Sequence, residues 1–446
     1  MQGHVSILSV SPEAAAMIAS GGRISTMDGT AGEIYAKSLA AGQEKNEKLI
    51  GKVLSSGHTS VLEHCYVNLS FENVSVLAEQ FLIEFRLASF TVKSRRYVDF
   101  SRAGFVSPDF PDDTQKAVFE DTVKSLFGIY DALEAAGVPK EDARFVLPYC
   151  FCSNFFCSMN ARELVHVMNE LAYGRGSRIP ELRALGESLF AQCEQQLPFL
   201  AVRKPEAYRQ PDGFCPRPVQ LLTSNAPVTV LAAPQDAEGL ICSAYQLARG
   251  YVPQPLTESE QTALLKSLLT QPRKRELEQA GYTLLFGGLS LAALTHLTRH
   301  RMQALCAPEL LKAARYDRYV LPESVRQAGM EAQYRGAFRM AGEAAAQLRT
   351  AGAGEDALSY LLLSGQTVPV LTTMNAGELY VFFRLRCCNR AQWEIRDAAC
   401  AALTALRKTS PLLFSLYGPT CFVSGKCPEG RMTCGRQAEI RKQFSE

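Results

Sequence analysis

The chain carries one pattern of residues twice, and this duplication constrains its fold more than any other feature. The segments EFRLASFTVKSRRY and RHRMQALCAPELLKAARY both end in Arg-Tyr. A Leu-Glu-His or Leu-Glu-Gln tripeptide precedes each one. The interval from the end of the tripeptide to the next shared arginine is 22 residues both times, from His64 to Arg86 and from Gln279 to Arg301. Equal spacing of matching residue types indicates an internal repeat.

A second pair of landmarks lies in the same register. SMNARELVHVMNEL and TMNAGELYVFFRLR share Met-Asn-Ala-x-Glu-Leu. Asn160 follows Arg86, and Asn375 follows Arg301, by the same interval of 74 residues. The two coincidences together predict a fusion of two copies of one fold.

The composition is that of a globular protein. The net charge of +2 on 446 residues gives no global basic field, so nucleic acid is not an expected partner. The start, MQGHVSILSVSPEAAAMI, lacks the basic and apolar regions of a secretion signal. The longest apolar stretch, residues 281–297, includes polar side chains and is expected to be a buried element, not a membrane span. The fourteen scattered cysteines favour reduced thiols and a cytoplasmic location.

Local patterns predict helices with a few strands. Apolar residues at helical spacing predict helices over residues 31–55, 114–136 and 161–197, and a short apolar helix at 234–249. The alternation in YVNLSF, residues 66–71, predicts a half-buried strand. Because strands and helices do not alternate regularly, the predicted fold class is α+β.

The two copies are expected at residues 1–202 and 257–446. Residues 203–256 are predicted to be a linker with a short helix, since their first part is rich in proline and polar residues and includes PDGFCPRP. Thr257 and Glu260 have the spacing of a capping box that would begin the second copy.

Arginine clusters are the candidate chemical groups, because the chain has no Walker loop, His-Glu-x-x-His or strand-linked Gly-x-Gly-x-x-Gly. Arg299-His300-Arg301 ends an apolar segment. The guanidinium groups suit phosphate or pyrimidine carbonyls. A solvated helix end, where carbonyl groups favour cations, explains the same pattern.

A second cluster, Ser94-Arg95-Arg96, could bind a phosphate through a hydroxyl and a guanidinium, or could be a basic surface turn. Two further candidates have equally plain structural explanations. Asn160, two residues before Arg162, could be only an N-cap. Arg144 could simply pair with Asp142.

Together these pieces resemble the flavin-dependent thymidylate synthases. The family signature is Arg-His-Arg-x-x-Ser-x-Asn-Glu-x-Ser-x-Arg-Tyr. Gly-His-x-x-x-x-Glu-His precedes it. Asn-Ala-Arg and a late Arg-Leu-Arg leading to Ala-Gln-Trp-Glu-Ile-Arg follow it. The first copy keeps Gly57, His58, Glu63, His64, Arg86, Ser89, Ser94, Arg96, Tyr97 and Asn160-Ala161-Arg162. The second keeps Arg299-His300-Arg301, Asn375, Arg384, Arg386 and AQWEIR at 391–396.

The departures from the signature are nearly complementary. The first copy has Glu84-Phe85 for Arg-His, Thr91-Val92 for Asn-Glu, Leu171 for the late arginine, and RIPELR at 178–183 for AQWEIR. The second has Ala304, Cys306 and Ala307 at the Ser and Asn-Glu positions, Gly377 for the arginine after Asn375, and Arg273 where the first copy has His58.

The resemblance implies site roles and an assembly. Substrate binding falls to Ser94, Arg96, Arg144 and Arg386, with Arg96 and Arg386 also catalytic. Flavin binding falls to His58, Ser60, Asn160, Arg162, Arg299, His300 and Arg301. Family members are homotetramers with sites shared between subunits. The fused chain is therefore expected to build one composite site from both copies, and to dimerise into a pseudo-tetramer.

The implied reaction is FAD-dependent methylation of dUMP to dTMP, with methylenetetrahydrofolate and NADPH as co-substrates. The resemblance also implies a mixed or antiparallel sheet flanked by helices. Ser94 would bind substrate and would not be a nucleophile. Two alternatives remain open: a diverged flavin- or nucleotide-dependent transferase on the same scaffold, and a catalytically inactive nucleotide-binding homologue.

The C-terminal segment CFVSGKCPEGRMTCG stands outside the resemblance. Its Cys421, Cys427 and Cys434 could join Cys387 or Cys388 around zinc or an iron–sulfur cluster. Because no Cys-x-x-Cys pair is present, an exposed tail with free thiols and no metal is the favoured interpretation.

Overall fold

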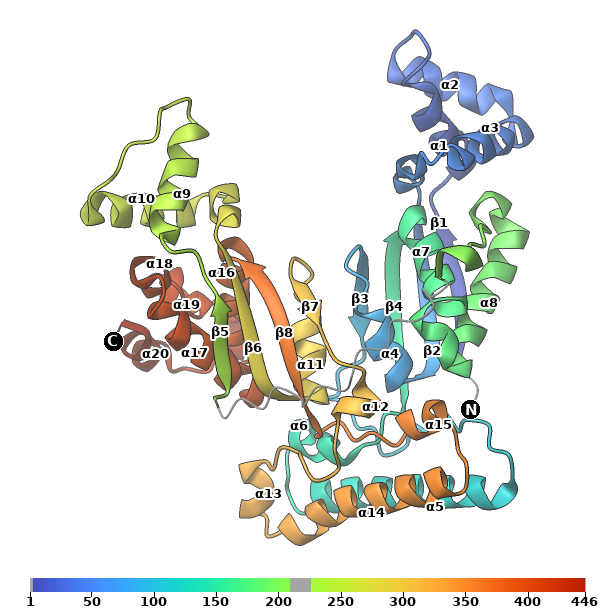
Figure 1. Cartoon of the computed structure of the whole chain (residues 1–446), viewed down its shortest axis with the longest axis vertical. Coiled ribbons are helices and arrows are strands. Elements are labelled where there is room, and N and C mark those ends of the chain that lie inside the picture. Colours follow the sequence, from blue (N-terminus) through green and yellow to red (C-terminus); the bar gives the residue numbers. More distant parts are fainter. Residues whose placement is uncertain (1–2, 209–225, 446) are drawn as a thin grey trace. The chain divides into compact units, whose positions relative to one another are not determined.

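The described residues form two compact units. The computed structural model describes residues 3–208 and 226–445, so PDGFCPRP lies outside the described residues. Unit 1 contains residues 3–208 and 321–364, and unit 2 contains residues 226–320 and 365–445 (Figure 1). The units therefore do not follow the division into two sequence copies, because residues 321–364 of the second copy belong to unit 1.

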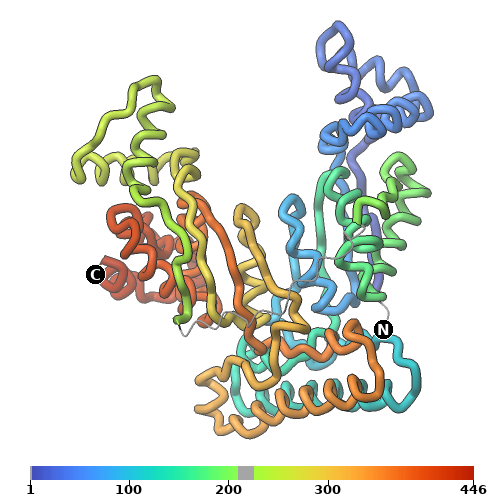
Figure 2. Tube along the Cα trace, viewed as in Figure 1, coloured from blue at the N-terminus to red at the C-terminus, as the bar shows by residue number. Residues whose placement is uncertain are grey.

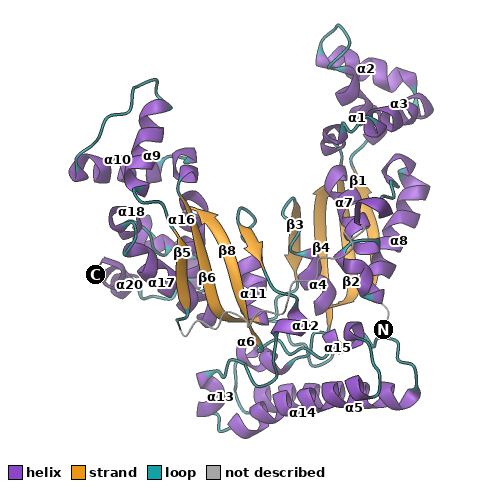
Figure 3. Cartoon of the chain, in the orientation of Figure 1, coloured by secondary structure: helices purple, strands orange, loops and turns teal. Residues whose placement is uncertain are grey.

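Each unit contains one four-stranded antiparallel sheet of the same topology (Figure 3). The strand orders are β1-β2-β4-β3 in unit 1 and β5-β6-β8-β7 in unit 2. The strands are β1 (His4–Val10), β2 (Tyr66–Ser75), β3 (Ala88–Val92), β4 (Cys152–Asn160), β5 (Val228–Ala232), β6 (Gly281–Ser290), β7 (Ala304–Cys306) and β8 (Thr367–Asn375). The predicted strand at 66–71 is the first part of β2. The antiparallel α+β fold is confirmed.

The registers of the two sheets also match. Tyr66 pairs with Asn160 in the first sheet, and Gly281 pairs with Asn375 in the second. These pairs lie 215 residues apart along the chain (66 to 281 and 160 to 375). Both central pairings shift register near the end of the first strand, between Phe71 and Val74 in β2 and between Phe286 and Leu289 in β6. A shared β-bulge is a conserved feature of a sheet and not a defect, so the duplication extends to this detail.

Glycine and proline divide two of the predicted helices of unit 1. The helix predicted over 31–55 is interrupted at Gly42, whose φ of +78° does not fit a helix. The helix predicted over 161–197 is interrupted before Pro180, which starts a new helix. The unit 1 helices are α1 (Ala14–Arg23), α2 (Ala31–Ala41), α3 (Gln43–Ser55), α4 (Val76–Leu82), α5 (Asp113–Ala135), α6 (Lys140–Ala143), α7 (Ala161–Ala172), α8 (Pro180–Gln196), α13 (Glu323–Gln327), α14 (Glu331–Thr350) and α15 (Glu355–Ser359).

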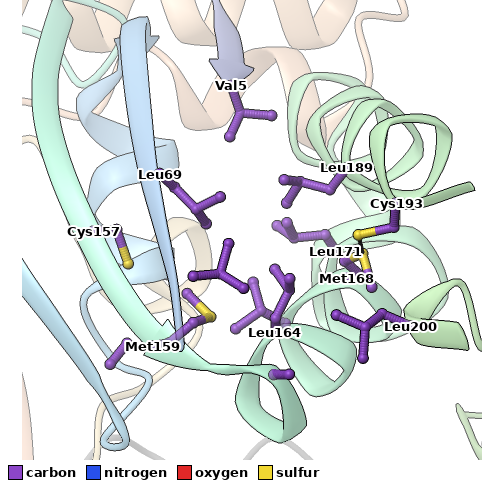
Figure 4. Close-up of a cluster of buried hydrophobic side chains, with 14 of the residues drawn as sticks. Val5, Leu69, Cys157, Met159, Leu164, Met168, Leu171, Leu189, Cys193 and Leu200 are labelled. Atoms are coloured by element: carbon purple, nitrogen blue, oxygen red, sulfur yellow. Dashed lines mark hydrogen bonds between the residues drawn. The ribbon is translucent and has the colours of Figure 1, made fainter. Parts of the chain in front are cut away.

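The core of unit 1 lies between its sheet and helices α7 and α8 (Figure 4). Leu69 and Met159 come from β2 and β4, and Leu164, Leu171 and Leu189 come from the two helices. All five side chains are fully buried. Burial of these apolar side chains is the main contribution to the packing of α7 against the sheet.

The segment 321–364 completes unit 1. Its helix α14 runs beside α5 (Figure 2). The side-chain amide of Gln115 donates to the carbonyl of Ala351 at 3.0 Å, and the amide of Tyr149 donates to the carbonyl of Leu362 at 2.7 Å. The second copy therefore supplies part of the structure that surrounds the first copy.

Unit 2 begins before the predicted second copy. The region predicted as a linker, 203–256, includes β5, which pairs with β6, and the helix α9, which corresponds to the predicted helix at 234–249. The capping box of Thr257 and Glu260 starts α10, as predicted. The unit 2 helices are α9 (Ala237–Leu247), α10 (Glu258–Thr270), α11 (Leu291–Thr298), α12 (Leu310–Ala313), α16 (Ala376–Arg386), α17 (Trp393–Arg407), α18 (Pro411–Ser415), α19 (Thr420–Val423) and α20 (Gln437–Ser445). Among the described residues, every helix is too short or too polar to cross a bilayer.

A glutamate anchors the helix that precedes each arginine segment. In unit 2, Glu394 accepts hydrogen bonds from the Ser290 amide at 2.7 Å and from the Ser290 hydroxyl at 2.5 Å. In unit 1, Glu181 accepts the matching bonds from Ser75 at 2.7 and 2.5 Å. RIPELR at 178–183 and AQWEIR at 391–396 therefore each supply a glutamate that binds the serine at the start of a helix, which supports their alignment.

Candidate functional site

The imidazole of His300 lies between a carboxylate and a guanidinium in unit 2. His300 Nδ1 is 3.0 Å from Glu378 Oε1, and Arg386 Nε donates to His300 Nε2 at 2.9 Å. Arg386 also donates to the carbonyl of His296 at 3.1 Å. The structure therefore brings together two predicted site residues, His300 and Arg386, through contacts that the sequence did not specify.

These contacts fix the tautomer of His300. An arginine has only donors, so Nε2 must accept, and Nδ1 must carry the proton that it donates to Glu378. Burial lowers the pKa of His300, the bond to Glu378 opposes this change, and Arg386 adds to it. The imidazole is therefore neutral at pH 7 and holds the guanidinium of Arg386 in one orientation.

The local sequence explains why these groups meet. Asn375 caps α16 and accepts from the amide of Glu378 at 2.8 Å, so the shared Met-Asn-Ala-x-Glu-Leu motif begins this helix. Glu378 lies in the first turn of this helix, and its carboxylate contacts His300. Arg386 is the last residue of the helix. The ring of Phe382 packs edge-on to the imidazole, with the ring centroids 5.0 Å apart.

Arg299 and Arg301 differ from the histidine between them. Both arginines are exposed, whereas His300 is buried. The Arg-His-Arg segment therefore combines a positioning group with two cations at the surface. Elsewhere in unit 2, Arg249, Arg273 and Arg275 line a cavity of about 610 Å³ together with Glu276, which pairs with Arg249 at 3.5 Å. Arg273 is the residue aligned with His58. The surface cations and this cavity fit a ligand that carries phosphate groups.

Three of the predicted substrate residues lie together in unit 1. Arg96 Nε donates to the carboxylate of Glu141 at 2.6 Å, and Arg144 Nε donates to the backbone carbonyl of the same residue at 3.1 Å. The hydroxyl of Ser94 accepts from the amide of Arg96 at 3.3 Å. Arg144 is buried, so its charge is held in a site of restricted solvent access.

Arg95 has a different role from its neighbours. Its guanidinium pairs with the fully buried carboxylate of Glu79. The second oxygen of Glu79 accepts from the hydroxyl of Ser153. Arg95 therefore belongs to the interior of unit 1, and the basic cluster predicted from sequence is divided between the core and the site.

Four predicted flavin residues lie at a short 3-10 helix and at the start of α7 in unit 1. His58 and Ser60 are exposed at the short 3-10 helix that follows α3. Arg162 is joined to this helix by an ion pair with Glu63 at 2.6 Å. Asn160 caps α7 and accepts from the amide of Glu163 at 2.9 Å, so it has the capping role considered above.

Unit 1 lacks the histidine and arginine of unit 2. Phe85 occupies the position of His300, and Leu171 occupies that of Arg386. Leu171 is fully buried among apolar side chains in the core (Figure 4). Glu163 remains at the position of Glu378. Unit 1 therefore retains the carboxylate but cannot form the three-residue arrangement of unit 2.

Two glutamates that contact predicted site residues were not predicted from the sequence. Glu378 and Glu141 hold the predicted residues in place, through His300 in unit 2 and Arg96 in unit 1. Glu378 had a detectable signal, because the glutamate of Met-Asn-Ala-x-Glu-Leu is present in both copies. Glu141 had none, because its partner is 45 residues away in the chain.

The lowered pKa of His300 predicts a dependence of stability on pH. As the pH falls below about 6.5, the unfolded chain binds a proton before the folded chain does, so the free energy of unfolding should decrease. The slope is at most about 1.4 kcal/mol per pH unit, and this term is constant above that window. Urea unfolding between pH 5 and 8 should show this slope in the wild type relative to His300→Phe. Equal pH dependence in the two proteins would contradict a neutral His300.

Comparisons with known proteins identify a family. The family described as "Thymidylate synthase complementing protein" matches residues 6–199 and 229–412. A flavin-dependent thymidylate synthase from Geobacter sulfurreducens is 34% identical over 199 residues, which are 43% of this chain and 84% of that protein. Proteins of the same name from Clostridium tetani and Sulfolobus acidocaldarius are each 30% identical, over 98% and 78% of their lengths and 50% and 44% of this chain.

One solved structure is also similar, although too loosely to transfer residue roles. It is a UMP/dUMP methylase from Streptomyces cacaoi bound with 5-Br dUMP, with a TM-score of 0.38 and 22% identity, over 45% of this chain and 93% of that one. Each of the three synthases matches about half of this chain or less, and the family model matches two successive segments, as expected for a duplication.

Proposed function

The chain belongs to the flavin-dependent thymidylate synthase family, and from this premise we propose that it converts dUMP to dTMP with FAD as cofactor. Methylenetetrahydrofolate would supply the one-carbon unit, and a reduced nicotinamide nucleotide such as NADPH would supply electrons. We place the reaction in the cytoplasm, because the thirteen cysteines among the described residues are all free thiols. The observation that carries the proposal is the orientation of Arg386 by a neutral His300.

Arg386 would act on the pyrimidine. The guanidinium of Arg386 is held by its bonds to the imidazole of His300 and to the His296 carbonyl. A donor directed at a uracil carbonyl would stabilise the charge that accumulates in the ring when C5 reacts. Because the imidazole and the carbonyl fix the guanidinium beforehand, little reorganisation is needed at the moment of reaction.

Ser94, Arg96 and Arg144 would bind the nucleotide phosphate. Arg96 and Arg144 both contact Glu141, so two guanidinium groups meet at this residue. A phosphate would take the place of the Glu141 carboxylate on Arg96, because a guanidinium fits two phosphate oxygens as it fits a carboxylate. Arg96 would also orient the substrate relative to Arg386.

His58, Ser60, Asn160 and Arg162 in unit 1, and Arg299, His300 and Arg301 in unit 2, would hold the flavin. FAD supplies the redox chemistry when bound, while the protein orients the reactants and excludes water. The exposed arginines and the arginine-lined cavity of unit 2 fit the two phosphates of FAD.

A complete set of groups would require both copies. Unit 1 has no counterpart of His300 or Arg386, and Gly377 of unit 2 replaces the arginine found at Arg162. The complementary losses favour one composite site, with the chain forming a homodimer in place of the family's tetramer.

The proposal predicts flavin-coloured protein that releases tritium from C5-labelled dUMP in the presence of the co-substrates. Arg96→Ala should weaken dUMP binding by about 10-fold or more, because a charged hydrogen bond contributes roughly 1.5–3 kcal/mol. Titration calorimetry measures this loss. Arg339→Ala is the matched control, since that exposed arginine pairs with Glu343 on the surface of α14.

The outcomes separate the possible functions. Colourless protein that stays colourless with FAD would refute the cofactor assignment. Nucleotide binding without tritium release would support the inactive homologue, a possibility raised by Ala307 at the position of the signature glutamate.

A further inference from the structure

The turn at residues 94–98 follows β3 and carries two of the proposed phosphate ligands, Ser94 and Arg96. Both are partly exposed, whereas Arg95 between them is buried, and every other residue of the turn is exposed or partly exposed. The amide of Val98 donates to the carbonyl of Ser94 at 3.0 Å and closes the turn. Arg95 is therefore the side chain that fixes this turn to the interior of unit 1.

The partner of Arg95 is held in place by other segments of unit 1. Glu79, whose carboxylate pairs with the Arg95 guanidinium, lies on α4. The first two amides of α4 donate, each at 3.0 Å, to carbonyl groups of the segment that leads into β4. The hydroxyl of Ser153, on β4, donates to the second oxygen of Glu79, and the ring centroid of Phe151 lies 5.8 Å from the Arg95 guanidinium. The position of the Glu79 carboxylate is therefore fixed by both α4 and β4.

The second copy lacks this charged network. Its three positions, counted from the matching residues of the repeat and from the shared Arg-Tyr pair, all carry buried apolar residues in unit 2: Leu294 for Glu79, Ala314 for Arg95 and Val368 for Ser153. Ala313 takes the place of Ser94. Arg315, aligned with Arg96, pairs with Asp317 of its own loop at 2.8 Å, and 56% of its side chain is exposed, against 20% for Arg96. The network, the serine hydroxyl and the sheltered position of the arginine are therefore absent together.

Stability alone does not account for the charged groups in unit 1. Two charges lose their hydration when they are buried, and well-packed apolar side chains in their place are often neutral or stabilising. Unit 2 has apolar side chains at the same three positions. What the charged pair adds is direction, because a guanidinium and a carboxylate bond in a defined geometry.

We propose that Arg95 and Glu79 are positioning residues for the phosphate of the nucleotide. By fixing the middle of the turn, they hold Ser94 and Arg96 where both reach the same phosphate. The pair itself does not touch the substrate. Groups that are already ordered in the free protein lose less conformational entropy on binding, so affinity rises. The inference rests on the proposed function, because it takes Ser94 and Arg96 as phosphate ligands.

Two variants separate positioning from stability. Glu79→Leu, Arg95→Met replaces the pair by apolar side chains, so it should melt close to the wild type but bind dUMP about 10-fold more weakly, since a misplaced guanidinium loses much of a charged hydrogen bond. Glu79→Gln keeps an oxygen for Arg95 and an N–H donor for the Ser153 hydroxyl, but leaves a buried charge uncompensated. It should melt at a lower temperature and bind dUMP with nearly wild-type affinity. Calorimetry at 25 °C measures both affinities on folded full-length protein.

Hydrogen exchange of the ligand-free protein tests the positioning without any nucleotide. Three amides of the turn, those of residues 96–98, donate to the hydroxyl or the carbonyl of Ser94. In the double variant these amides should exchange about 10-fold faster than in the wild type, because the turn opens more often. In Glu79→Gln they should exchange at nearly the wild-type rate. Ser153→Ala is a milder second variant, which removes one bond to Glu79, leaves the ion pair and should increase the exchange by a smaller factor.

Leu189→Ala is the matched control, because it leaves a cavity in the core of unit 1 and touches no member of the network. It should lower the melting temperature and change neither the exchange of the turn nor the affinity for dUMP.

Three results would overturn the proposal: wild-type exchange of the turn in the double variant, faster exchange with unchanged dUMP affinity, or an affinity that falls in step with melting temperature across all the variants. Wild-type protein that binds no dUMP would instead refute the proposed function, and the exchange rates would still show whether the pair fixes the turn.

Discussion

Arg386→Ala should lower kcat/KM for dUMP by about 10²–10³-fold, which is the usual cost of removing one preorganised donor to a developing negative charge. The effect should fall mainly on kcat, because the donor matters most when charge accumulates in the pyrimidine ring. Arg386→Lys should recover little of the loss, since an ammonium cannot bond His300 Nε2, the His296 carbonyl and the substrate in the same fixed geometry. Tritium release gives the rate, and calorimetry gives dUMP affinity separately.

His300→Phe is the companion variant, because Phe85 occupies this position in unit 1. It removes the acceptor that orients Arg386 and leaves Glu378 without its buried partner. We expect a smaller loss of kcat than for Arg386→Ala, since the guanidinium is still present but less restrained. Arg339→Ala should change neither constant. Normal turnover in Arg386→Ala would show that this residue does not act on the substrate.

Glu79→Ala should lower the free energy of unfolding by about 3–5 kcal/mol, which is typical when one partner of a buried ion pair is removed. Both side chains are almost completely inaccessible, at 7% exposure for Arg95 and 0% for Glu79. The substitution leaves the guanidinium buried without its carboxylate, and it also removes the acceptor of the Ser153 hydroxyl. Differential scanning calorimetry of the full chain measures the loss, and hydrogen exchange in β4 assigns it to unit 1.

Unit 2 indicates a control for this prediction. Leu294 stands at the position of Glu79, and Val368 at that of Ser153, so the second copy fills the same place with apolar side chains. A Glu79→Leu, Arg95→Met double variant should therefore be close to the wild type in stability, since well-packed apolar replacements of a buried pair are often neutral or stabilising. A double variant as unstable as Glu79→Ala would mean that packing, and not an uncompensated charge, causes the loss.

The sequence predicted the repeated elements well. The equal intervals of 22 and 74 residues predict the matching strand registers, because equal spacing between matching residues is consistent with strands and helices of the same length and order. The capping box at Thr257 and the helix at 114–136 were also predictable, since both depend on local patterns. The helices over 31–55 and 161–197 were too long as predicted, because periodicity continues across breaks that a single glycine or proline imposes.

Contacts between distant segments were not predictable. Nothing local in residues 321–364 indicates that they pack with α5 instead of with their own copy. For the same reason, the sequence did not distinguish the buried Arg95 from Arg96 or the buried His300 from the arginines beside it. Burial of a residue depends on which distant elements pack over it, and a single sequence does not show which elements pack together.

The path of the chain has a consequence for any attempt to recover the ancestral subunit. The polypeptide leaves unit 2 after residue 320 and re-enters it at residue 365. A gene divided between the two copies would therefore give two incomplete fragments. The upstream fragment would expose the face of α5 that packs against α14, and the downstream fragment would carry α14 without α5. We therefore expect neither fragment to fold alone, and a chain that must stay fused allows each copy to lose groups that the other retains.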